Sequence, residues 1–169
     1  MHKQMHKQLI RYMKSITDLK EAKNYLHLYV NSDKPLIKSA AEIAFIVSYC
    51  KPFSGNKEPT KGVPNELPKK SLKTLTVQER DIHSILVQEY RNKMVAHSEL
   101  THLEPEIEIF EQGTAIKVKH KRTNCLLDRL SIDDTFCLVN KLISITEHFA
   151  QELTKEVGDG VFSLLESGA

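Results

Sequence analysis

The sequence has few cysteines, and none of them form a pair of the kind that holds a metal ion. Its three cysteines, Cys50, Cys125 and Cys137, form no CxxC motif, and an odd number without framework spacing is typical of reduced intracellular thiols. The sequence also lacks a Gly-rich phosphate loop, a nucleophile elbow and a dense cluster of Cys and His. The enzyme classes built on those motifs therefore have little support, and we expect no metal ion and no cofactor.

Long hydrophobic runs are absent as well. No stretch approaches the roughly 20 apolar residues that span a membrane, and the basic N-terminus is followed by no apolar run, so a signal peptide is not expected. The 169 residues are 40% hydrophobic and 27% charged, which is the balance of one soluble globular domain over 1–169. The net charge of +2 is too small to indicate nucleic-acid binding by itself. We predict a cytoplasmic protein without a membrane partner.

Apolar residues at three- and four-residue steps predict a mainly α-helical chain. The first helix, or two collinear ones, is expected from Met5 to about Val30. Three more are expected over residues 35–49, 77–96 and 131–157. Asn31-Ser32-Asp33-Lys34-Pro35 supplies a side-chain cap and a first-turn proline for the second helix, and Thr76 with Glu79 forms a capping box for the third. The second helix is apolar on most sides, so we expect it to be the central buried helix.

Three segments depart from the helical pattern. Residues 51–74 contain four prolines, two glycines and six lysines, and form either a mobile solvated loop or a basic flap over an anionic substrate. The tail, residues 158–169, is either disordered or docked on the body or on a second subunit. Residues 106–119 alternate in polarity around Gln112-Gly113, which predicts a β-hairpin. Its expected pairs are Ile107 with Val118, Ile109 with Ile116, Glu106 with Lys119 and Glu108 with Lys117.

The most informative segment closes the predicted third helix. Arg91 and Asn92 precede His97, so an always-charged phosphate binder lies near the one side chain that titrates around neutral pH. This combination suits metal-free phosphodiester chemistry. On an ideal helix Arg91 and His97 diverge by about 120°, so a joint site would need two copies across a twofold axis unless the last turn unwinds. In the alternative interpretation, His97 caps the helix and Arg91 forms a surface ion pair.

The order Arg91, Asn92, four residues, His97 matches the Arg-polar-x4–6-His motif, and the chain resembles the HEPN superfamily over residues 5–157. The end of the second helix, from Ser48 to Ser54, is similar to the abortive-infection branch. The resemblance implies a mainly all-α fold, with a four-helix up-and-down bundle and a small inserted hairpin near 106–119. It also implies a homodimer whose cleft lies between the motif helices. Many members are metal-independent endoribonucleases of toxin–antitoxin or phage-defence systems.

The resemblance also implies roles for individual residues. His97 would take a proton from an RNA 2′-hydroxyl or deliver one to the leaving oxygen, Arg91 would bind the phosphate, and Asn92 would orient either partner. Lys93 would add positive charge. Three further basic residues follow in the predicted hairpin, and they form either an RNA-contacting arm or a solvated strand edge: Lys119, Lys121 and Arg122.

One departure limits the resemblance. Toxins that pair with nucleotidyltransferase antitoxins often have a tyrosine two positions after the histidine, where this chain has Glu99. We therefore leave the type of any antitoxin open. The missing tyrosine and the modest net charge favour the alternative function, a HEPN-like bundle without catalysis that binds nucleotides or proteins. A purely structural helical protein with a coincidental motif is the third possibility.

Overall fold

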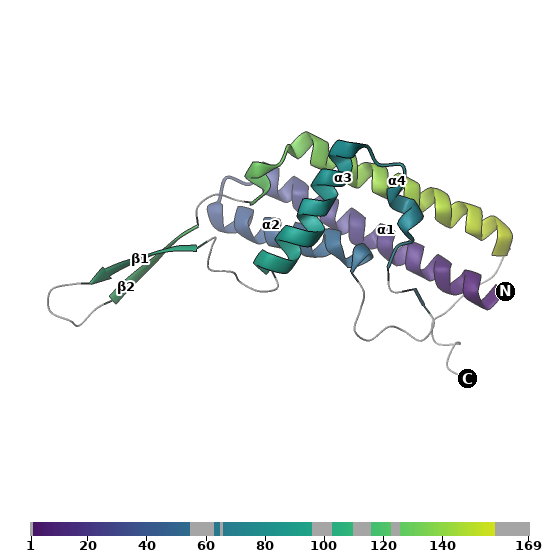
Figure 1. Ribbon diagram of the computed structural model, residues 1–169, viewed down its shortest axis with the longest axis horizontal. Helices are drawn as coiled ribbons and strands as arrows, with labels where there is room; N and C mark the ends of the chain where they lie inside the picture. Colours follow the sequence, from purple (N-terminus) through teal and green to yellow (C-terminus); the bar gives the residue numbers. More distant parts are fainter. Residues whose placement is uncertain are drawn as a thin grey trace.

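The computed structural model describes residues 2–54, 63–64, 66–95, 103–109, 116–122 and 126–157. Four helical segments pack together in an all-α body (Figure 1). They are α1 (His2–Asn31), α2 (Pro35–Cys50), α3 (Val77–Ser84) with its continuation η3 (Ile85–Val95), and α4 (Ile132–Val157). Within the described residues, three short turns of 3-10 helix lie between them: η1 (Lys51–Phe53), η2 (Lys69–Leu72) and η5 (Leu126–Arg129). α1 packs against both α2 and α4, and η3 packs against α2.

Side chains cap the starts of α3 and α4, but not the start of α2. Thr76 forms the predicted capping box, because its side chain accepts from the Glu79 N–H and the Glu79 carboxylate accepts from the Thr76 N–H. At the start of α4, the Ser131 hydroxyl accepts from the Asp134 N–H at 3.3 Å. At α2 the predicted side-chain cap is wrong. The N-cap position is Lys34, which makes no side-chain cap hydrogen bond, and the proline at the first helical position begins the helix without one.

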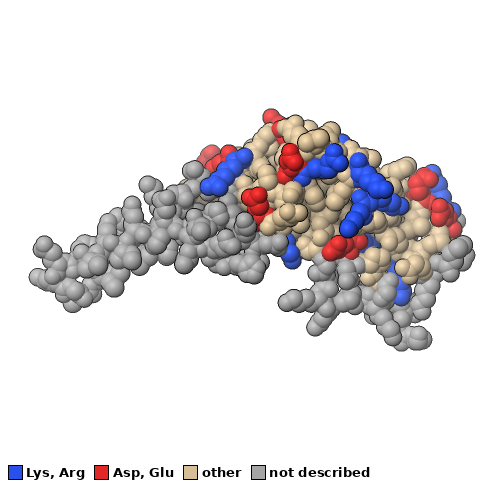
Figure 2. All heavy atoms as spheres, in the orientation of Figure 1, with Lys and Arg blue, Asp and Glu red and all other residues tan. Residues whose placement is uncertain are grey.

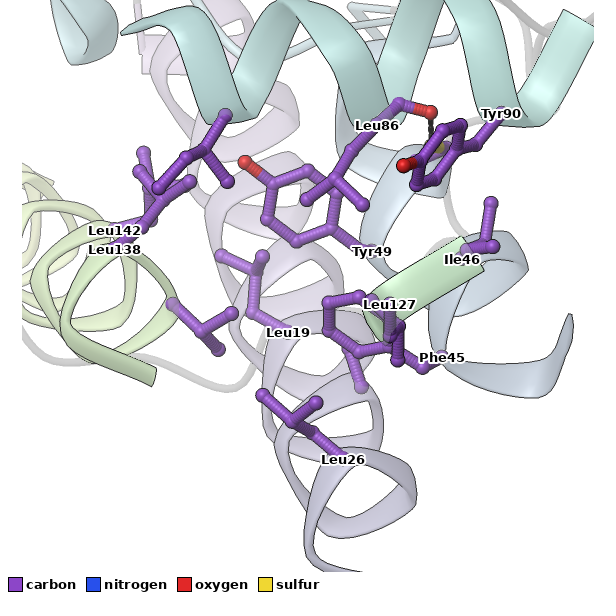
Figure 3. Close-up of a cluster of buried hydrophobic side chains, with 14 of the residues drawn as sticks. Leu19, Leu26, Phe45, Ile46, Tyr49, Leu86, Tyr90, Leu127, Leu138 and Leu142 are labelled. Atoms are coloured by element: carbon purple, nitrogen blue, oxygen red, sulfur yellow. Dashed lines mark hydrogen bonds between the residues drawn. The ribbon is translucent and has the colours of Figure 1, made fainter. Parts of the chain in front are cut away.

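The hydrophobic core lies where the four helical segments meet. Figure 3 shows leucine and aromatic side chains from α1, α2, η3, η5 and α4 converging on one cluster. Most of these side chains are fully buried, which stabilises the fold by roughly 1.5–3 kcal/mol for each large apolar residue. A smaller cluster joins the N-terminal half of α1 to the C-terminal half of α4 and contains Tyr12, Ile16, Leu67 and Ala150.

Helix α2 is only half buried, so its expected position as the central buried helix is wrong. One side carries Ala41, Phe45, Ile46 and Tyr49, all buried in the core. The opposite side is exposed: Leu36 is 83% exposed, Ile43 41% and Val47 37%. Ala40 is exposed beside them. We call these four residues, Leu36, Ala40, Ile43 and Val47, the α2 outer face.

The basic segment 51–74 is fixed to the body at both ends. The Leu67 N–H donates to the Pro52 carbonyl at 2.8 Å, and both of these residues are buried. Two of its six lysines also contact the body: Lys51 pairs with Glu21 at 3.2 Å, and Lys70 Nζ lies 4.3 Å from the centre of the Phe149 ring. The two alternatives for this segment, a mobile loop or a basic flap, concern mainly residues 55–62 and 65. These lie outside the described residues, so both alternatives stay predictions.

Two strands, β1 (Leu103–Ile109) and β2 (Ile116–Arg122), pair antiparallel. Ile109 lies opposite Ile116 and Glu108 opposite Lys117, which is the register expected from the alternating pattern. The strands are longer than expected, because the pairing extends to Leu103 and Arg122. The expected turn at residues 112–113 and the tail at 158–169 lie outside the described residues.

Candidate functional site

The described part of the motif, residues 91–95, lies on η3, and Arg91 is the motif residue whose side chain the structure describes. Arg91 is half buried. Burial raises the pKa of the Cys50 thiol to about 12, and the positive charge of Arg91 opposes this rise. Arg91 therefore lies near the C-terminal end of α2 instead of pointing only to solvent. Asn92 and Lys93 belong to the same helical segment, but their side chains and His97 lie outside what the structure describes.

The winding of η3 changes the expected geometry of the motif. From Ile85 to Val95 the segment is a π-helix, in which each N–H donates to the carbonyl five residues earlier and each turn holds more residues than in an α-helix. The angle of about 120° between Arg91 and His97 assumed an ideal α-helix, so that assumption is wrong for the part of the motif on η3. Whether Arg91 and His97 of one copy can meet depends on the position of His97, which lies outside the described residues.

The basic residues of the predicted arm lie together on one strand. Lys119, Lys121 and Arg122 are all in β2, with Lys119 opposite Glu106 and Lys121 opposite Glu104. Lys119 and Lys121 alternate with His120, so they share one face of the strand. The backbone thus brings two of the three basic residues of the predicted arm to a common face of β2, each across from a glutamate.

Sequence analysis missed a partly buried polar pair that joins α2 to α3. The Tyr49 hydroxyl lies 2.8 Å from Nδ1 of His83, and the Phe53 ring meets the His83 ring edge-on. Burial lowers the pKa of His83 to about 4, so the ring is neutral near pH 7. Through its hydrogen bond with Tyr49 of α2 and its ring contact with Phe53 of η1, the neutral His83 joins α3 to both elements. No sequence spacing signals this contact, since the residues are far apart in the chain.

A second missed residue is Glu42, which is fully buried in the middle of α2. Its Oε1 accepts from the Leu127 N–H at 2.7 Å, and the next residue, Asp128, accepts from the Tyr29 hydroxyl at 2.6 Å. These bonds fix η5 to α1 and α2. A glutamate inside an otherwise apolar helix was the available sequence signal, because such a side chain needs a partner.

Charged side chains from α1 and η1 border a polar cavity of about 300 Å³. Its lining is Arg11, Lys14, Asp18 and Lys51. The Arg11 guanidinium donates to the carbonyls of Lys51 and Pro52 at 3.1 and 2.8 Å. Burial raises the pKa of Asp18, while Lys51, at 3.7 Å, opposes the rise. The contacts of Arg11 make it a cap for the end of α2 and η1.

The described part of the face drawn in Figure 2 does not favour a ligand of a single charge sign. Lysine and arginine side chains are interspersed with aspartate and glutamate across the described part of the face in Figure 2. Within the described residues, no three side chains of His, Cys, Asp or Glu are grouped so as to hold a metal ion.

Comparison of the chain with family models, with curated proteins and with solved structures found no match. The HEPN resemblance therefore rests on the sequence pattern at residues 48–54 and 91–97, without support from these comparisons. Among the described helices, none combines the length and the apolar composition needed to cross a membrane.

Proposed function

We propose that this chain is a metal-independent, cytoplasmic endoribonuclease of toxin or phage-defence type, which acts as a homodimer with a composite active site. The finer fold that goes with this proposal is a HEPN-like up-and-down bundle carrying the hairpin of β1 and β2. One observation carries the proposal: Arg91 and Asn92 lie in η3, which packs on α2 within four joined helices, with Arg91 half buried beside Cys50. A guanidinium held by the bundle is suited to binding a phosphate in a fixed direction.

In the proposed reaction, Arg91 binds and neutralises the scissile phosphate, and Asn92 orients the phosphate or the attacking group. His97 moves the proton of the RNA 2′-hydroxyl or protonates the leaving 5′-oxygen. Attack by the 2′-oxygen breaks the bond to the 5′-oxygen and leaves a 2′,3′-cyclic phosphate and a 5′-hydroxyl. Lys93, Lys119, Lys121 and Arg122 add positive charge along the RNA. Local π-winding supports this placement, because π-helical turns occur often at functional sites.

Cleavage of RNA in the presence of a chelator tests the proposal. Wild-type protein is expected to cut RNA, and both Arg91→Ala and His97→Ala are expected to reduce the rate at least about 100-fold. Arg80→Ala removes an exposed arginine from the same helical segment and is the matched control. Circular dichroism separates lost chemistry from lost folding, since Arg91 is half buried. Equal rates for all four proteins, or no cleavage of any RNA by wild type, would contradict the proposal.

The alternative function is a HEPN-like module that binds nucleotides or proteins without catalysis. The mixed charges on the described face favour it over extended contact with nucleic acid (Figure 2). Binding of a nucleotide that depends on Arg91, together with no cleavage by wild type, would support this alternative.

A further inference from the structure

The α1–α4 groove is an open groove between α1 and α4, at the end of the molecule where α1 begins and α4 ends (Figure 1). Its volume is about 480 Å³. The lining includes Ile16 and Ala150, both buried, and Met13, which is 55% exposed. Ile16 and Ala150 also belong to the smaller core cluster. That cluster therefore reaches the surface in the groove, where apolar side chains face water.

A lysine borders each end of the groove. At one end Lys20 pairs with Glu147 at 2.7 Å, and at the other, near the end of α4, Lys155 pairs with Glu152 at 2.7 Å. Both lysines are exposed, and an ammonium group has three donors, so each can bind a second carboxylate. Glu147 and Lys155 are eight residues apart on α4, which is about 12 Å along the helix axis. The groove therefore suits an apolar segment of about this length with an acidic residue at each end.

The tail that follows α4 has this pattern. Residues 158–169 lie outside the described residues, but their sequence has acids at Asp159 and Glu166 and no lysine or arginine. Between the two acids the apolar residues are Val161, Phe162, Leu164 and Leu165. On a helix, Asp159 and Glu166 would be about 10 Å apart, close to the spacing of the lysines along the groove. Val161, Leu164 and Leu165 would then share one apolar face.

The connection from α4 to this apolar run has the length of a helix hairpin. α4 ends at Val157, and Gly158 follows, which is the residue type favoured just beyond a helix end. Residues 158–160 would be the connection, and antiparallel helices are joined by loops of about two to five residues. A reversal there brings the apolar run back along the helix that lines the groove, with Asp159 toward Lys155 and Glu166 toward Lys20.

We propose that residues 161–165 dock in the α1–α4 groove of their own chain, antiparallel to α4, and cover the smaller core cluster. A segment joined to the groove by a short connection has an effective concentration on the order of millimolar, which a separate molecule does not have. Complementary charge at both ends fixes the direction of the segment. The proposal goes beyond the proposed nuclease and rests on neither Arg91 nor RNA cleavage.

Thiol labelling of the full chain tests the proposal. Met13→Cys puts a thiol in the groove, in a background of Cys125→Ser and Cys137→Ser. With the native tail this thiol is expected to react at least about 10-fold more slowly than with a charged tail that carries Phe162→Glu and Leu165→Glu. The reason is that the two carboxylates cannot be buried against apolar side chains without a large cost.

A thiol on the α2 outer face is the matched control. Leu36→Cys is expected to react at the same rate with the native and the charged tail, because Leu36 is exposed on another helix. Cys50 is buried in all of these proteins, so it adds little to the labelling, and circular dichroism checks that each variant folds. Equal rates for the thiol at position 13 with both tails would overturn the proposal.

Disulfide trapping identifies which tail fills the groove. In the same background, Gln151→Cys, which lines the groove, and Leu164→Cys are expected to form a disulfide within one chain in oxidised glutathione. Leu36→Cys with Leu164→Cys is expected to form at least about 10-fold less of it. A disulfide-linked dimer would assign the groove to the tail of another copy, and a yield no higher than the control would leave the groove without the tail. Either result would overturn the proposal.

Discussion

The Tyr49 hydroxyl and Nδ1 of His83 lie 2.8 Å apart, and they join the end of α2 to α3 inside the protein. Burial lowers the pKa of this histidine to about 4, compared with about 6.5 for an unperturbed one. Between these two pH values the unfolded chain binds the proton that the folded chain excludes. The free energy of unfolding therefore falls as the pH falls through this window.

We predict that His83→Asn reduces this pH dependence. Between pH 6.5 and 4 the wild type is expected to lose about 1–2 kcal/mol more than the variant, less than the whole pKa shift implies because the ring is only partly buried. Urea unfolding at several pH values measures the difference. Tyr49→Phe, which keeps the burial but removes the hydroxyl, is expected to retain the wild-type slope. Parallel pH profiles for wild type and His83→Asn would contradict the assignment.

Glu42 is predicted to stabilise the attachment of η5. Glu42→Ala removes the acceptor of the buried Leu127 N–H and leaves a cavity, so we expect a loss of about 2–4 kcal/mol in the free energy of unfolding. Glu42→Gln keeps an oxygen acceptor and should lose less. Glu89→Ala, at an exposed glutamate of η3, is the control. A Glu42→Ala protein as stable as this control would show that the hydrogen bond contributes little.

The capping box at the start of α3 gives a smaller prediction. Thr76→Ala removes the side-chain acceptor for the Glu79 N–H and is expected to cost about 1 kcal/mol. Thr76→Ser retains the hydroxyl and is expected to stay within a few tenths of wild type. Thermal unfolding of the three proteins measures the difference, and equal destabilisation by alanine and serine would mean that the methyl group, not the hydroxyl, matters.

The two cysteines that the structure describes should differ strongly in reactivity. Cys50 is buried with a pKa of about 12, whereas Cys137 is exposed. In a Cys125→Ser background, a thiol reagent at pH 8 is expected to label Cys137 rapidly and Cys50 only when the protein opens, because the thiolate is the reactive form. Denaturing urea should equalise the rates. Equal labelling of both thiols in the native protein would contradict the burial of Cys50.

The positions of the helices could be predicted from sequence because each has a local cause. Apolar steps of three and four residues define α1 and α4, and the Thr76 box begins α3, so the bounds differ from expectation by a few residues. The burial of α2 could not be predicted in the same way. Its composition indicates that apolar surface must be covered, but not whether the cover is the rest of the chain or another molecule.

The polar contacts were harder to predict because they join residues distant in sequence. Tyr49 and His83 are 34 residues apart, and Glu42 and Leu127 are 85 apart. Nothing in the local pattern pairs them. The π-winding of η3 was equally hidden, since its residues are ordinary helix formers and nothing in their order distinguishes a π-helix from an α-helix.

The Pro52 carbonyl accepts from both the Leu67 N–H and the Arg11 guanidinium. These hydrogen bonds join Pro52 to Leu67 and to α1, and so form a closed junction. Chain length added beyond such a junction costs only about 0.6 kcal/mol for each doubling of the loop, since the ends are already joined. An epitope or a fluorescent label inserted between Ser54 and Val63 is therefore expected to change the free energy of unfolding by no more than about 1 kcal/mol.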